Sequence, residues 1–192
     1  LGVSLIVVGK GTNPAITYWN SSAHEKDLTK IYEDEGNDVY RNRTAYPRFG
    51  LYYDVRDGIA DDQALTAIES QALDFRKTLI IREQLGTSFE TGTGSAELLS
   101  SGLNSLAFRI ETSKPALFYL SDSYDPGWHA TINGKKVPIL HANYNFRAVA
   151  VPAGASTVSF WYLPTSFVIG GVISVLSLTG LFGFGLYRRL KR

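Results

Sequence analysis

The chain has 192 residues and a net charge of +1, which gives no electrostatic case for nucleic-acid binding, since such a domain usually shows a concentrated basic face. It has no cysteine, so disulfides, thiolate nucleophiles and cysteine-based metal sites are excluded. The 11 Tyr, 10 Phe and 3 Trp favour a strand-rich fold, because aromatic side chains suit a half-buried pleated surface.

Residues 1–100 are expected to form an α/β part of an outer domain. The opening apolar run, 1–9, predicts a core strand, since it is too short for a membrane span and lacks the features of a signal peptide. A first helix is predicted near 23–34, because Ser22 and Glu25 form a capping-box pattern before a shared apolar face. The absence of methionine, even at position 1, leads us to expect a fragment or a mature piece of a longer protein.

The next segments continue this part of the chain. Residues 39–55 are expected to be extended and broken at Pro47, and a second amphipathic helix is predicted near 61–75. Residues 78–83 resemble a buried strand. The small, polar and Gly-rich stretch 87–104 predicts a loop.

From residue 101 to 164 the pattern is that of an antiparallel β-sandwich. Six short strand-like runs lie between 106 and 162 and are separated by turn residues. Asn133-Gly134 predicts a two-residue hairpin, because that turn needs positive φ at both positions. The predicted fold class is therefore mainly β (α+β): an extracytoplasmic antiparallel β-sandwich with one or two short helices, followed by a C-terminal transmembrane helix.

A transmembrane helix is predicted over 165–187. Residues 167–187 carry no charge, and at 1.5 Å per residue they reach about 30 Å, the thickness of a bilayer core. The expected interface anchors are Trp161, Tyr162, Tyr187, Arg188 and Arg189. By the positive-inside rule the basic tail 188–192 is cytoplasmic, which places residues 1–164 outside the cell membrane.

One face of this helix collects small residues, which allow close backbone approach between membrane helices. They are Ser166, Gly170, Ser174, Ser177 and, more loosely, Gly185. The predicted partners are therefore the lipid bilayer and other transmembrane helices, of the same protein or of another one. We expect further spans upstream, because an outward domain with a cytoplasmic C-terminus needs an export signal that this sequence does not show.

Several motifs in this sequence resemble the C-terminal region of the YfhO family of multi-pass membrane proteins. They lie at 39–49, Tyr124 to Trp128, Asn133 to Lys135, Asn143 to Val149, Val151 to Gly154, and Phe160 to Pro164. That family is similar to the GT-C class of glycosyltransferases, which use polyprenyl-phosphate sugars on the outer membrane face. The resemblance implies a role in cell-envelope glycosylation, with a lipid-linked sugar or envelope glycan as partner.

The same resemblance puts the catalytic acid of such enzymes in an early extracytoplasmic loop, between upstream helices. No catalytic residue is therefore carried over to this chain, and no cofactor is expected. The first functional hypothesis is a non-catalytic, extracytoplasmic end of a polytopic GT-C-like protein. The alternative is a single-pass accessory subunit docked on a larger membrane complex, and a third, weaker hypothesis is a free-standing carbohydrate-binding module.

Three residues are candidate sugar contacts, each with a structural alternative. Asp122 and Asp125 could form a carboxylate pair for acid–base chemistry, but aspartate is also the expected residue in turns. Trp128 could stack on a sugar ring or belong to the core.

Metal ligands are not expected, since His24, His129 and His141 lack ligand spacing. The acidic residues Glu33 to Glu35 with Asp38 could hold Ca²⁺ or form a solvated face. Asn20 and Asn42 match the N-glycan acceptor pattern, which leaves their modification open.

Overall fold

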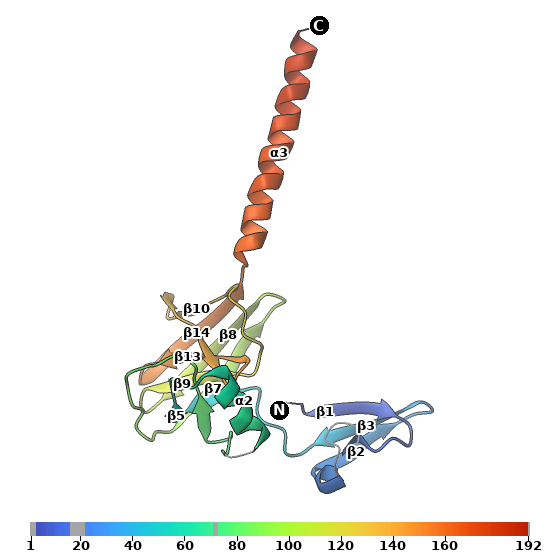
Figure 1. The fold of residues 1–192 in the computed structure, drawn as a ribbon, viewed down its shortest axis with the longest axis vertical. Coiled ribbons are helices and arrows are strands. Elements are labelled where there is room, and N and C mark those ends of the chain that lie inside the picture. The colour runs from blue at the N-terminus through green and yellow to red at the C-terminus, as the bar shows by residue number, and fades with distance from the viewer. Residues whose placement is uncertain (1–2, 16–21, 71–72, 192) are drawn as a thin grey trace. The chain divides into compact units, whose positions relative to one another are not determined.

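The computed structural model describes residues 3–15, 22–70 and 73–191 (Figure 1). They form two compact units, Leu1–Phe49 and Gly50–Arg192. The chain is mainly β, with antiparallel sheets, two short helices and one long apolar C-terminal helix, which confirms the predicted class. The units divide at residues 49 and 50, whereas the sequence placed a division at residue 100, which lies within a strand of the second unit.

The first unit is a three-stranded antiparallel sheet of order β1-β3-β2. Its elements are β1 (Leu5–Gly9), the 3-10 helix η1 (Ser22–Asp27), β2 (Leu28–Glu33) and β3 (Asn37–Asn42). In β1 only alternate residues are buried, Ile6 and Val8. The predicted N-terminal strand is confirmed, with one face packed and the other exposed.

The helix predicted near 23–34 is wrong beyond Asp27, where the chain becomes β2. Leu28, Ile31 and Tyr32 have helical spacing, but Ile31 and Tyr32 are exposed and β2 pairs with β3 along its length. The turn between the strands is made by Asp34, whose carboxylate accepts hydrogen bonds from the backbone N–H groups of Gly36 and Asn37. Sheet pairing therefore overrides a local helical pattern that had no core to bury against.

Asp38 is the buried charge of this unit. Its side chain is 2% exposed, and it accepts hydrogen bonds from Lys30 Nζ at 3.0 Å and from the backbone N–H of Gly11 at 3.2 Å. The hydrogen bond from Lys30 is the main reason that the pKa of Asp38 is lowered, and the same bond raises the pKa of Lys30. The acidic run thus forms a β-turn and an ion pair within the sheet.

We expect the first unit to lose stability on acidification. Because the pKa of Asp38 is lower in the folded state, its contribution is present above the unfolded value of about 3.9 and is lost as pH falls through the folded pKa. Hydrogen exchange of residues 37–42, corrected for the intrinsic pH dependence, should rise over this range in the native protein and much less in Asp38→Asn. The strand at 105–112, in the other unit, is the internal control, and equal acid responses of native and variant protein would contradict the prediction.

The second unit contains two larger antiparallel sheets and one parallel pair. The five-stranded sheet has the order β11-β10-β14-β8-β7, the four-stranded sheet β12-β13-β9-β4, and β5 pairs in parallel with β6. The strands are β4 (Phe49–Tyr52), β5 (Asp54–Arg56), β6 (Thr78–Ile80), β7 (Gly94–Ser101), β8 (Ser105–Thr112), β9 (Ala116–Leu120), β10 (Trp128–Ile132), β11 (Lys135–Val137), β12 (Leu140–Ala142), β13 (Phe146–Val151) and β14 (Gly154–Tyr162). Five of the six strand-like runs predicted from residue 106 onward are confirmed as single strands, whereas the run 135–140 divides between β11 and the start of β12, which lie in different sheets.

β7 corrects the loop predicted over 87–104. It pairs with β8 from Gly94↔Thr112 to Ser101↔Leu106 and forms the edge of the sheet, with nearly all its side chains exposed. An edge strand of this kind is held by backbone hydrogen bonds, so it needs no hydrophobic alternation for a sequence pattern to reveal. The hairpin predicted at Asn133-Gly134 is confirmed, with φ values of 49° and 79°.

The two larger sheets pack face to face through aromatic side chains. Phe118 of β9 lies 4.9 Å from Phe108 of β8 and 6.4 Å from Phe160 of β14, measured between ring centroids. All three rings are at most 1% exposed. They form the centre of the sandwich that the strand pattern predicts.

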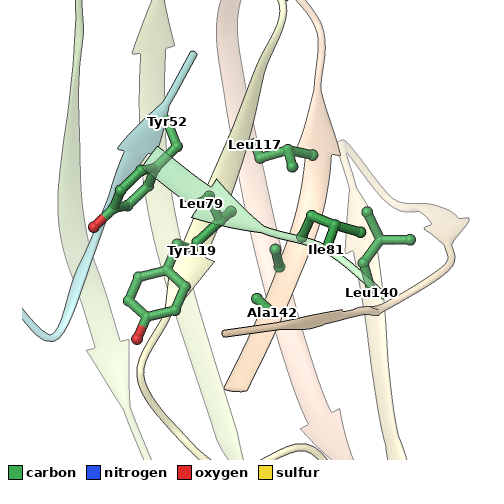
Figure 2. Packing of buried hydrophobic residues seen from close by; sticks show 8 residues of the cluster. Tyr52, Leu79, Ile81, Leu117, Tyr119, Leu140 and Ala142 are labelled. Atoms are coloured by element: carbon green, nitrogen blue, oxygen red, sulfur yellow. The ribbon is translucent and has the colours of Figure 1, made fainter. Parts of the chain in front are cut away.

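The other face of the four-stranded sheet is also covered. Leu117 and Tyr119 alternate with Phe118 on β9 and pack against Leu79 and Ile81, as Figure 2 shows. Residue 81 also bridges Ala142 of β12. The segment 78–81 is therefore fully buried, in agreement with the strand expected over 78–83.

The second helix predicted near 61–75 is present but shorter. It is α2 (Asp61–Glu69), and Ser70 closes it with a hydrogen bond from its N–H to Thr66 O. Asp74 then forms a turn, with Lys77 and Thr78 donating their N–H groups to its carbonyl. The predicted helical residue Ala72 lies outside the described residues, and Phe75 follows the helix.

The C-terminal helix α3 (Thr165–Leu190) has 26 residues and a mean hydropathy of 2.1 in its most apolar window. At 1.5 Å per residue it is about 39 Å long, enough to cross a bilayer. None of its described residues is buried. Such a helix is a candidate membrane span, as the sequence predicts.

Candidate functional site

A buried arginine organises the end of the sandwich from which α3 continues. Arg147 lies on the apolar strand β13 and is 1% exposed. Its Nη2 donates to Asp122 Oδ2 at 3.0 Å. Its guanidinium carbon lies 3.9 Å from the centroid of the Trp128 ring and 5.5 Å from that of Phe160.

The stacking explains how a permanent charge is tolerated at this depth. A guanidinium cannot lose its proton, so burial requires a counter-charge and polarisable neighbours. Asp122 supplies the first and the ring faces of Trp128 and Phe160 supply the second. Arg147 thus covers one face of the Trp128 ring and binds one carboxylate oxygen of Asp122.

Asp125 holds the turn before β10. Its Oδ1 accepts the N–H of Gly127 at 2.7 Å, and its carbonyl accepts the N–H of Trp128 at 3.0 Å. This is the turn geometry that the sequence offered as the alternative to a carboxylate pair. Asp125 also contacts Tyr162, whose pKa is raised chiefly by burial and further by this carboxylate.

A second polar cluster lies where β12 meets Glu83, just after the buried segment 78–81. His141 Nδ1 lies 2.6 Å from Glu83 Oε1, and the N–H of His141 donates to Glu83 Oε2 at 3.0 Å. The ring of Tyr124 stacks on His141 with 3.4 Å between centroids. Since Tyr124 also donates its N–H to Asn145 O at 2.7 Å, this cluster attaches the 121–127 loop to the β12–β13 hairpin.

Asn143 completes the connection to the buried segment. It has a φ of 45°, and its N–H donates to Ile80 O at 2.9 Å while its Oδ1 accepts the N–H of Ile80 at 3.0 Å. At Asn143 the backbone is no longer extended, and the side-chain oxygen accepts the Ile80 N–H in place of a backbone carbonyl of a paired strand. Its side chain also contacts Tyr119, whose pKa is raised mainly by burial.

The turn before β10 is tied to the start of α3. Leu163 donates its N–H to Gly127 O at 2.8 Å, and the rings of Trp128 and Tyr162 lie 5.2 Å apart. A Cβ on Gly127 would come within 2.7 Å of the Tyr162 ring and 3.1 Å of Pro164 Cα, so only glycine fits this approach. Next to them His129 stacks on Trp161 at 5.4 Å. The predicted interface aromatics Trp161 and Tyr162 are thus the last two residues of β14, just before the helix.

At the other end of α3 the predicted anchors pair cations with aromatic rings. The guanidinium of Arg188 lies 5.9 Å from the Phe184 ring, and Lys191 Nζ lies 4.7 Å from the Tyr187 ring. Arg189 is exposed one residue further along. Aromatic and basic side chains together at a helix end are typical of a membrane interface.

Two serines on the small-residue face of α3 have their hydroxyls satisfied within the helix. Ser174 Oγ donates to Gly170 O and Ser177 Oγ to Ile173 O, each at 2.8 Å. The hydroxyls therefore need no partner in an apolar environment. Packing of other helices on Ser166, Gly170, Ser174 and Ser177 stays a prediction.

In the part of the chain that the structure describes, no three His, Cys, Asp or Glu side chains gather as metal ligands do. Asn42 is 9% exposed, and the amide nitrogen that would carry a glycan donates a hydrogen bond to Val3 O inside the first unit. Asn20 lies outside the described residues, as does the side chain of His24.

Sequence reasoning named Asp122, Asp125 and Trp128 but missed the residues that join them. Arg147 joins Asp122 to Trp128, whereas Glu83, His141 and Asn143 attach the β12–β13 hairpin to the segment 78–83. The signal available was an arginine in the otherwise apolar run 146–151. Contact of Asp122, Asp125 and Trp128 with a sugar stays a prediction.

The comparisons with known proteins bear on this same part of the chain. The family model described as "Bacterial membrane protein YfhO" matches residues 94–174. Residues 94–174 are a YfhO-family region. The YfhO-family region runs from β7 through the Arg147 contacts and across Pro164 into α3.

A curated relative supports the same identification. The chain is 34% identical over 86 residues to the "Uncharacterized protein YfhO" of Bacillus subtilis (strain 168). The match covers 45% of this chain and 10% of that protein, so it spans about a tenth of the relative's length. No solved structure matches the chain.

Proposed function

We propose that this chain is the extracytoplasmic sandwich and last membrane span of a polytopic YfhO-family protein acting in cell-envelope glycosylation. In this proposal the sandwich is not itself catalytic. It lies over a membrane-embedded core and helps to shape the cleft for the acceptor or the lipid-linked sugar.

One observation carries the proposal: the YfhO-family region crosses the junction between sandwich and helix. Its last residues, 165–174, are the first part of α3, and its earlier residues supply the five-stranded sheet. The hydrogen bond from Leu163 to Gly127 and the close approach at Gly127 lie at that junction. An outward sandwich continuing directly into a span is the arrangement expected of a domain that works at the membrane surface.

The orientation rests on the charges that flank α3. Arg188 and Arg189 lie in the last turn of α3 and Lys191 follows it, whereas residues 157–187 contain no Lys or Arg. Loops rich in Lys and Arg remain in the cytoplasm. The sandwich is then on the outer side, where enzymes that use polyprenyl-phosphate sugars act.

The direct test is sugar transfer in membranes from cells with and without the intact gene that encodes this sequence. Deletion should abolish transfer from a polyprenyl-phosphate sugar to an envelope polymer, and the native gene should restore it. Unchanged transfer would overturn the glycosylation role. In the same membranes, a native protein with an intact mass near 21.1 kDa would instead favour the single-pass subunit.

The non-catalytic role of the sandwich gives a sharper prediction. Asp125→Asn keeps the oxygen that accepts the Gly127 N–H, so the turn should persist. We expect the variant gene product to retain transfer activity, whereas loss of a general acid or base typically costs about 10²–10⁴-fold. A loss of that size, with unfolding behaviour unchanged, would show that Asp125 is catalytic.

A further inference from the structure

The tip of the β7–β8 hairpin carries a leucine that the fold leaves uncovered. Gly102 donates its N–H to Ser105 O at 2.8 Å, which closes a tight turn with Leu103 and Asn104 in the middle. Leu103 is fully exposed, at 101%. Turn tips usually carry Gly, Asn, Asp, Ser or Pro, so a large apolar side chain in this place is unusual.

The hairpin tip lies beside the start of the candidate span. Tyr162 donates its N–H to Asn104 O at 2.9 Å, and Trp161 is paired with Ser105. From Tyr162 to the first residue of α3, Thr165, three residues reach at most about 10 Å. The polar zone on each side of a bilayer core is about 5–8 Å thick, so Leu103 is within reach of it.

The surroundings of Leu103 suit a lipid interface better than water. No residue from Leu98 to Phe108 is charged, so insertion of the tip would not require a charge to leave water. Leu163, which precedes the span, is also exposed, at 44%. Trp161 and Tyr162, the neighbours across the strand pair, are of the types enriched at membrane interfaces.

We propose that Leu103 and the β7–β8 tip insert into the outer lipid interface as a second membrane contact beside α3. The occupant of this apolar tip is the bilayer, because the tip is hydrogen-bonded to the residues that lead into the span. The proposal rests on the proposed membrane span. It gives the sandwich a preferred orientation over the membrane, since two separate points of contact limit its rotation about the junction.

The test uses single cysteines carrying an environment-sensitive fluorophore in the full-length protein, with any native cysteine outside this sequence replaced by serine. The protein is reconstituted in phosphatidylethanolamine–phosphatidylglycerol nanodiscs with or without lipids that carry a spin-label quencher. Leu103→Cys probes the tip, and Phe167→Cys is the matched site within the span. Lys135→Cys is the control in water. Lys135 begins β11 and pairs with Ile132, which lies four residues along β10 from Trp128.

We expect the label at 103 to show blue-shifted emission and quenching several-fold above that at 135, approaching that at 167. Quenching at 167 but not at 103 would overturn the lipid contact while leaving the span intact. An unquenched label at 167 would overturn the span itself, and the tip proposal with it. Because the Leu103 side chain is fully exposed, its replacement should not disturb folding.

Discussion

Replacing Arg147 with alanine is expected to lower the free energy of unfolding of the second unit by about 3–5 kcal/mol. The substitution removes an ion-pair partner of Asp122, whose side chain is only 24% exposed. It also removes the group that packs against the rings of Trp128 and Phe160, leaving a gap in the core. Urea unfolding in mild detergent, followed by tryptophan fluorescence, measures the change.

Arg109→Ala is the matched control for this prediction. Arg109 also pairs with an acidic residue, Glu97, at 3.2 Å, but both side chains are about two-thirds exposed, at 65% and 66%. An exposed pair contributes about 0–1 kcal/mol, so this variant should unfold nearly like the native protein. If Arg147→Ala costs no more than Arg109→Ala, the buried pair does not hold the sandwich end together.

Asn143→Ala is expected to cost about 2–4 kcal/mol, from two sources. Alanine is strained at a φ of 45°, and the N–H of Ile80, a residue 2% exposed, loses its acceptor. Asn143→Gly should avoid the stability loss due to backbone strain but not the loss due to the missing acceptor. Asn143→Asp should avoid the second loss, because it keeps the accepting oxygen. The same urea experiment separates the two contributions.

The chain offers a close control at Asn133. This residue has a φ of 49°, and its Oδ1 accepts the N–H of Thr157 at 2.8 Å, but the contact is exposed. Asn133→Ala should therefore cost only the backbone strain, about 1–2 kcal/mol, because water can replace the lost acceptor. Equal losses at 133 and 143 would mean that burial of the Ile80 amide adds nothing.

The contacts of Arg147 and Asn143 explain why the family motifs occur together. The motif Asn143 to Val149 contributes Asn143 to the buried segment and Arg147 to Trp128, which belongs to the motif Tyr124 to Trp128. The turn of that second motif is hydrogen-bonded to Leu163, next to the span. The motifs thus describe one connected structure that links the sandwich core to α3.

The features that the sequence revealed are those set by local chemistry. Short strand-like runs between turn residues indicated β8 to β11, β13 and β14, the Asn133-Gly134 pair indicated a hairpin through positive φ, and an uncharged apolar run indicated α3. The short range of these signals explains their success. Each depends on residues a few positions apart.

Tertiary structure decided the rest. The apolar residues of β2 have helical spacing, yet β2 is a strand because it pairs with β3. β7 has no hydrophobic pattern, yet it is a strand because it pairs with β8. The contacts of Arg147 with Asp122 and Trp128, and of Asn143 with Ile80, join positions 19 to 63 residues apart. The sequence by itself determined most strands from residue 106 onward, the Asn133-Gly134 turn and the long apolar helix, whereas only the folded chain decided which strands pair and how a buried charge is compensated, because both depend on partners distant in sequence.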